Sequence, residues 1–106
     1  MKIVILCAGG MSSSMLREKM RIAAKANGSD DEIISCSEVE MRKNRAGADI
    51  ILLSPQVRYL KKDFERQGGA IVEVIDMLSY GRMDGDAVYR DAIKLLNHPP
   101  ALKETN

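Results

Sequence analysis

The sequence predicts an α/β protein in which a four-stranded parallel sheet is covered by helices on both faces, a three-layer sandwich. Short apolar runs alternate with longer segments of helical periodicity along the 106 residues, as expected for parallel strands joined by crossover helices. The first run, Lys2 to Leu6, is almost unbroken apolar, which is typical of a strand buried on both faces. No internal repeat or linker interrupts this order. We therefore expect one domain over residues 1–106, with a short flexible tail at about 99–106.

The order of the elements follows from apolar spacing and from residues that start or stop helices. Gly28 follows the first helical pattern, as is common at helix ends, and Ser37 with Glu40 fits a capping box that opens a short helix. A loop through Tyr80, Gly81 and Asp84-Gly85 is expected before the last helix. The expected strands are 2–6, 32–35, 49–53 and 70–75; the expected helices are 12–27, 37–45, 57–67 and a last one carrying Val88, Ala92, Leu95 and Leu96.

Composition excludes several classes of function. The 16 basic and 15 acidic residues nearly cancel, so a surface that neutralises nucleic-acid phosphates is not expected. No apolar run is long enough to span a membrane. Cys7, Cys36 and His98 lack the spacing of metal ligands, and we expect neither a metal nor another cofactor. This cysteine usage favours a reduced, cytoplasmic protein.

Cys7 is the strongest candidate for chemistry. It ends the first apolar run, and the glycines Gly9 and Gly10 and a serine triplet follow before the first helix. A helix start offers unpaired N–H donors and a positive dipole end, and glycines let the backbone approach an anion closely. We therefore predict that Cys7 carries a phosphoryl group. The alternative is that Cys7 is a small buried residue filling the end of the strand.

Other residues near the predicted site have simpler alternatives. Among Ser12, Ser13 and Ser14, one serine can cap the helix while the others donate to phosphate. Asp76 fits an N-cap or a surface charge better than a general acid, because a carrier gains nothing from hydrolysis. Two groups complete the assignment: Cys36, Met11 and Met15 are expected to pack, and Arg58, Tyr59 and Tyr80 to be solvated rim residues.

Three stretches together resemble the IIB component of the bacterial sugar phosphotransferase system, lactose/cellobiose class. They are Cys7 to Ser14, Leu52-Leu53-Ser54-Pro55-Gln56, and Val72 to Asp76 with Tyr80 to Gly85. The resemblance implies strand order 2-1-3-4, as in flavodoxin-like and low-molecular-weight tyrosine phosphatase folds. One departure is Ser54, where the family pattern leads us to expect glycine.

The resemblance also implies a function. The family's cysteine, matched by Cys7, takes a phosphoryl group from a phosphohistidine of the IIA component. It passes that group to a β-linked sugar of the cellobiose, chitobiose or lactose type, held by the membrane component IIC. The residues that match the family's phosphate-binding loop are Ala8, Gly9, Gly10, Met11, Ser12, Ser13 and Ser14.

A low-molecular-weight cysteine phosphatase or an arsenate reductase is the main alternative. A phosphatase of this architecture has an arginine six positions after its cysteine, which binds phosphate with a two-pronged contact. Ser13 stands at that position here, and the first arginine is Arg17. The sequence therefore favours a phosphoryl carrier over a hydrolase.

Overall fold

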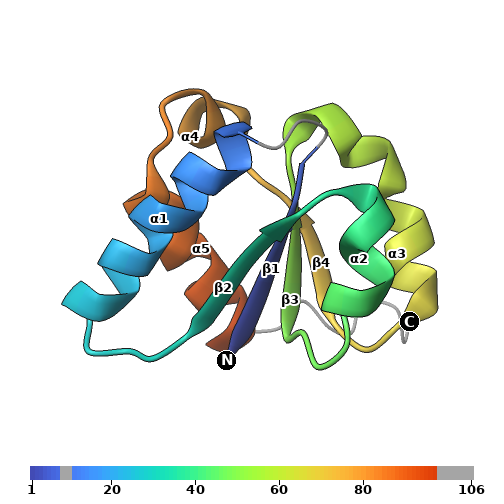
Figure 1. Cartoon of the computed structure of the whole chain (residues 1–106), viewed down its shortest axis with the longest axis horizontal. Coiled ribbons are helices and arrows are strands. Elements are labelled where there is room, and N and C mark those ends of the chain that lie inside the picture. Colours follow the sequence, from blue (N-terminus) through green and yellow to red (C-terminus); the bar gives the residue numbers. More distant parts are fainter. Residues whose placement is uncertain (8–10, 98–106) are drawn as a thin grey trace.

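The computed structural model describes the backbone of residues 1–7 and 11–97, and the side chains of the same residues except 11–13. Four strands and their connecting helices alternate along the chain (Figure 1). The elements are β1 (Lys2–Leu6), α1 (Met11–Ala26), β2 (Glu32–Cys36), α2 (Glu38–Asn44), β3 (Ile50–Leu53), the 3₁₀ helix η1 (Pro55–Leu60), α3 (Lys61–Gln67), β4 (Ile71–Val74), α4 (Met77–Gly81) and α5 (Gly85–Asn97).

The four strands form one parallel sheet in the order β2-β1-β3-β4, which confirms the predicted fold class and strand order. In the register, Ile3 lies between Ile33 on β2 and Ile50 on β3. Strand β1 is therefore central, and all four of its residues from Ile3 to Leu6 are fully buried. This accounts for the unbroken apolar run with which the chain begins.

Each face of the sheet has its own apolar core. Ile3 and Ile5 pack into a cluster with residues of α1, α4 and α5, whereas Val4 and Leu6 pack with residues of α2, η1 and α3. This division follows from the strand geometry, because successive side chains point to opposite faces. Figure 1 shows α1, α4 and α5 on one side of the sheet and α2 and α3 on the other.

The expected helix boundaries are mostly confirmed. Gly28 follows α1 with φ of 73°, a left-handed conformation that favours glycine. The Glu40 carboxylate accepts a hydrogen bond from the Ser37 backbone N–H at 3.0 Å, as the predicted capping box requires.

Two expectations were wrong in detail. The expected single helix over 57–67 is split into η1 and α3, with a kink at Val57. The expected loop after the fourth strand contains the short helix α4, whose N-cap is Asp76; its carboxylate accepts from the Ser79 N–H at 3.0 Å. This helix determines the position of Tyr80.

Helices α1 and α5 pack very closely at Gly85. A Cβ atom at this position would lie 2.5 Å from Cβ of Lys19 and 2.6 Å from its carbonyl carbon. Real Cβ atoms do not approach other heavy atoms this closely, so the missing side chain of Gly85 lets the start of α5 contact the backbone of α1.

Asp31 directly precedes β2, at the end of the sheet opposite the expected site. Its carboxylate accepts hydrogen bonds from Tyr89 and Ser29, and it lies 3.3 Å from the amino group of Met1. Burial alone would raise the pKa of Asp31, but these hydrogen bonds and the nearby ammonium outweigh burial and hold the pKa below its usual value of 3.8. The group is therefore charged and paired at neutral pH.

Within the described parts of the chain, none of the helices has the length and apolar character needed to cross a membrane.

Candidate functional site

Cys7 is the first residue after β1, at the carboxyl edge of the sheet. Its backbone N–H donates to the Cys36 carbonyl at 3.3 Å, which continues the pairing of β1 with β2 by one residue. Its side chain is buried, with 4% of its surface exposed. Cys7 therefore has a fixed backbone position at the edge where parallel α/β sheets bind ligands.

The predicted phosphate loop is described only in part. Ala8, Gly9 and Gly10 lie outside the described residues, so the prediction that they bind phosphate stays a prediction. Helix α1 begins at Met11, four residues after the thiol, and this places a helix start directly after the loop as expected. Ser12, Ser13 and Ser14 lie inside α1, so the suggestion that one of them precedes the helix as its N-cap was wrong.

Tyr80 is a second residue near the thiol whose environment differs from the expectation. It was expected on the solvated rim, but only 8% of it is exposed and it belongs to the core cluster of α1, α4 and α5. Its hydroxyl oxygen lies 3.3 Å from Sγ of Cys7, 73 positions earlier in the chain. One signal was available in the sequence: Tyr80 follows the fourth strand, at the same sheet edge as Cys7. If this tyrosine is buried, its hydroxyl needs a hydrogen-bond partner at that edge.

Ser54 lies beside Cys7, directly after the neighbouring strand β3. Its N–H donates to the Leu6 carbonyl at 2.9 Å, so the register that pairs Leu6 with Leu53 continues to Cys7 and Ser54. Alternation then places the Ser54 side chain on the sheet face of Ile5, Cys7 and Tyr80. Ser54 is fully buried, and its Oγ has no hydrogen-bond partner among the described residues.

Three other candidates have contacts of their own. Asp76 caps α4, in agreement with its N-cap interpretation. The Arg58 guanidinium donates to the Pro55 carbonyl at 2.9 Å, and the Arg17 guanidinium lies 3.2 Å from the Glu18 carboxylate.

Cys36 is hydrogen-bonded to Cys7 through the backbone, but its side chain lies on the opposite face of the sheet. It pairs with Leu6 in the register and packs in the core cluster of α2, η1 and α3, whereas Cys7 contacts Tyr80 in the opposite cluster. Burial raises the pKa of the Cys36 thiol, and the nearby Glu40 carboxylate raises it further. Neither Cys7 nor Cys36 forms a disulfide. The structural role expected for Cys36 agrees with this packing.

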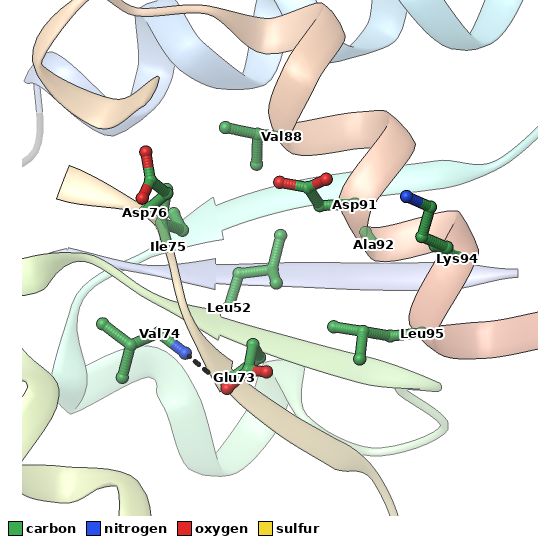
Figure 2. Close-up of a pocket in the computed structure, with 10 residues that line it drawn as sticks. All are labelled: Leu52, Glu73, Val74, Ile75, Asp76, Val88, Asp91, Ala92, Lys94 and Leu95. Atoms are coloured by element: carbon green, nitrogen blue, oxygen red, sulfur yellow. Dashed lines mark hydrogen bonds between the residues drawn. The ribbon is translucent and has the colours of Figure 1, made fainter. Parts of the chain in front are cut away.

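A cavity of about 640 Å³ lies between β4 and α5, and Figure 2 shows ten of the residues that line it. Its apolar floor includes Leu52, Val88 and Leu95, and charged side chains of Glu73, Asp91 and Lys94 stand around it (Figure 2). Cys7 and Tyr80 do not line it. The cavity is therefore separate from the thiol.

Several large apolar side chains are exposed on helices that follow the carboxyl ends of the strands. Val39 of α2 follows the edge strand β2 and Ile22 lies farther along α1, whereas four others lie on helices after β1, β3 and β4. Met77 and Leu78 begin α4 after β4, Tyr59 lies in η1 after β3, and Met15 lies in the second turn of α1 after β1. Each has more than half of its surface exposed, so the expectation that Met15 packs was wrong. Figure 1 shows α4 and the start of α1 at the end of the sheet where β1 finishes. We call these four residues the edge apolar group.

Relatives with curated names are similar over nearly the whole chain. The "PTS system oligo-beta-mannoside-specific EIIB component" of Bacillus subtilis is 35% identical over 98 residues. The galactose-specific and cellobiose-specific EIIB components of two Lactococcus lactis subspecies are each 39% identical over 103 residues. All three alignments cover 90% of this chain and 95% of the relative.

Solved structures with a similar fold are found as well. The cellobiose-specific phosphotransferase IIB component of Borrelia burgdorferi has a TM-score of 0.77 and 31% identity, over 96% of each chain. A YwlE mutant from Bacillus subtilis has a TM-score of 0.59 at 15% identity, over 92% of this chain and 99% of that one. The second likeness concerns the fold alone.

The model of the family described as "PTS system, Lactose/Cellobiose specific IIB subunit" matches residues 2–91. This range includes Cys7, Ser54 and Tyr80 and every element through the first half of α5. With the sequence relatives and the shared fold, it shows that this chain belongs to the lactose/cellobiose-specific IIB family of the sugar phosphotransferase system, whose members act as phosphotransferases.

Proposed function

We propose that Cys7 is the phosphorylated residue of this IIB component, and that it works as a single domain in the cytoplasm. Its sulfur accepts a phosphoryl group from a phosphohistidine of IIA and passes it to a sugar bound by IIC. One observation carries the assignment: Cys7 stands at the carboxyl edge of the central strand, four residues before a 16-residue helix begins. The loop between them, with the first turn of α1, supplies the phosphate-binding residues Ala8 to Ser14.

The start of α1 provides the electrostatic part of this proposal. The first N–H groups of a helix lack partners within the helix and carry a partial positive charge. Each such interaction with an anion stabilises it by about 0.3–1 kcal/mol. A phosphorylated cysteine carries about −1.5 to −2 charges at neutral pH, by analogy with other phosphorylated side chains. Several backbone donors can therefore hold the group on sulfur without a positively charged side chain.

The positions of the arginines in the sequence favour a phosphoryl carrier over a phosphatase. Ser13 occupies the position at which a phosphatase of this fold has its phosphate-binding arginine. Arg17, the first arginine of the chain, contacts Glu18 on the following position. Without a guanidinium that stabilises attack by water, a phosphorylated cysteine persists until its acceptor arrives.

We propose that the edge apolar group forms part of the surface that contacts IIA and IIC in turn. Exposed methionine and leucine side chains adapt to different partners because they are flexible and unbranched at Cβ. Partners that exchange a phosphoryl group with Cys7 must approach at this edge of the sheet. Met15, Tyr59, Met77 and Leu78 are exposed on three elements around that edge.

We propose a β-linked oligosaccharide of the cellobiose, chitobiose or lactose type as the sugar. Two of the named relatives are specific for cellobiose and for oligo-beta-mannoside. Uptake of a labelled sugar panel, with this protein supplied to membranes that contain its IIC, identifies the sugar by the dependence of uptake on Cys7.

Intact-mass analysis after incubation with phosphorylated IIA tests the role of Cys7. The wild type and a Cys36→Ser variant are expected to gain one phosphoryl group, whereas Cys7→Ser gains none. Cys36→Ser is the matched control because Cys36 is the other buried thiol. An equal mass gain in Cys7→Ser contradicts the proposal. Rapid, Cys7-dependent hydrolysis of p-nitrophenyl phosphate would favour the phosphatase alternative.

A further inference from the structure

The position of Tyr80 beside Cys7 is fixed by two backbone hydrogen bonds and by packing of its ring. The Tyr80 N–H donates to the Asp76 carbonyl at 2.9 Å, and the Tyr80 carbonyl accepts from the Met83 N–H at 3.0 Å. The ring packs in the core cluster, with 8% of the residue exposed. Its hydroxyl oxygen is therefore fixed 3.3 Å from Sγ of Cys7, on the core side of the sulfur.

The charge on sulfur decides which atom donates in this contact. With a neutral thiol, either the S–H or the O–H can donate. A thiolate has no proton, so the phenol must donate, and a hydrogen bond to a charged acceptor is about twice as strong as a neutral one. In the phosphorylated cysteine the sulfur is bonded to phosphorus and carries little negative charge. The contact is therefore strongest in the thiolate state.

We propose that Tyr80 is a catalytic residue that donates a hydrogen bond to the Cys7 thiolate in both transfer steps. This inference rests on the proposed function. In the first step the sulfur–phosphorus bond forms while the nitrogen–phosphorus bond of the donor breaks, and imidazole leaves with the electron pair. In the second step the sugar oxygen bonds to phosphorus, its proton goes to a base in the acceptor site, and sulfur leaves with the electron pair as thiolate. The phenol keeps its proton throughout.

Ionisable groups on the other elements around Cys7 have partners elsewhere. Cys36 of β2 lies on the opposite face of the sheet, in the other core cluster. The others have contacts of their own: Asp76 of α4 accepts from Ser79, Arg58 of η1 donates to the Pro55 carbonyl, and Asp84, before α5, accepts from the Ala87 N–H. Arg17 of α1 contacts Glu18 through its terminal nitrogen, whereas its buried Nε has no hydrogen-bond partner among the described residues. The Tyr80 hydroxyl, by contrast, lies within hydrogen-bond distance of the sulfur.

Titration of ¹³Cβ-labelled cysteine by NMR tests this inference without any phosphoryl transfer. In Tyr80→Phe the ring is kept and the hydroxyl is lost. The titration midpoint of Cys7 is expected to move to higher pH by about one to two units, because a hydrogen bond to a charged group changes the ionisation about ten- to hundredfold. The Cys36 signal, from the opposite face, is expected to keep its midpoint and so reports an intact fold.

Tyr89→Phe is the matched control. Tyr89 is buried in the same core cluster, but its hydroxyl donates to Asp31. This variant loses a hydroxyl without touching Cys7, and its Cys7 midpoint is expected to match the wild type. A Tyr80→Phe midpoint equal to that of the wild type overturns the inference, and so does an equal shift in Tyr89→Phe.

The rate of phosphorylation by IIA completes the test. Tyr80→Phe is expected to accept the phosphoryl group about tenfold more slowly at neutral pH, and to approach the wild-type rate at a pH above both midpoints. A slow rate that does not recover with pH contradicts the role of the hydroxyl. If Cys7 were not phosphorylated at all, the mass experiment would fail while the NMR shift remained, so the two proposals fail separately.

Discussion

Removal of one hydroxyl at Ser54 is expected to stabilise the protein. Ser54 is fully buried, and its Oγ lacks a hydrogen-bond partner among the described residues, although its backbone is paired on both sides. The family pattern leads us to expect glycine here, so no side-chain oxygen is needed at this position for the fold. Ser54→Ala removes the oxygen and keeps Cβ.

The magnitude follows from the desolvation of that oxygen. Leaving a buried polar atom unpaired costs about 1–3 kcal/mol. The alanine gives up the packing contacts of one oxygen atom, which offsets part of the gain. We therefore expect a net increase of about 1 kcal/mol in the free energy of unfolding, and a melting temperature higher by about 4 °C for a chain of this size.

Urea titration and thermal unfolding followed by circular dichroism measure this difference. Ser29→Ala is the matched control, because the Ser29 hydroxyl donates to the Asp31 carboxylate at 2.8 Å. The same chemical change is expected to lower the free energy of unfolding there by about 1–2 kcal/mol. A Ser54→Ala variant that unfolds more easily than the wild type would refute the reasoning, since it would mean that the hydroxyl is satisfied in the folded protein.

Three further outcomes are expected. The pKa of Asp31 is held below 3.8, so the stabilisation from its charged form is present above that pH and is lost as the pH falls below it. Asp31→Asn should therefore lose less stability than the wild type between pH 5 and pH 3 in urea titrations. An equal loss in the two proteins contradicts this. Gly85→Ala should destabilise the protein by about 1–3 kcal/mol through overpacking against Lys19, and an unchanged melting temperature would show that α1 and α5 separate freely. Leu78→Asp should slow phosphorylation by IIA about tenfold with little change in melting temperature. Ile22 is equally exposed but lies farther along α1, so Ile22→Asp should leave the phosphorylation rate unchanged. Equal rates in the two variants would mean that the edge apolar group does not contact IIA.

Local residues determined much of the architecture. The unbroken apolar run of β1 indicated a strand buried on both faces, and all four residues from Ile3 to Leu6 are fully buried. The capping box at Ser37 and the glycine after α1 marked helix ends where they occur. Such signals are readable because they depend on neighbours within about one turn. The split of η1 from α3 was missed, since an apolar spacing of three or four residues fits both a 3₁₀ and an α-helix.

The sequence by itself determined the family, the strand order through that resemblance, and the candidate thiol, because these depend on the type and spacing of residues along the chain. Only the tertiary structure decided what surrounds the thiol. Tyr80 lies 73 positions from Cys7, and Ser54 directly follows another strand, β3. Their burial beside the sulfur results from strand order and from the short helix α4, which no local spacing encodes. Contacts across the sheet edge arise only once the strands have paired.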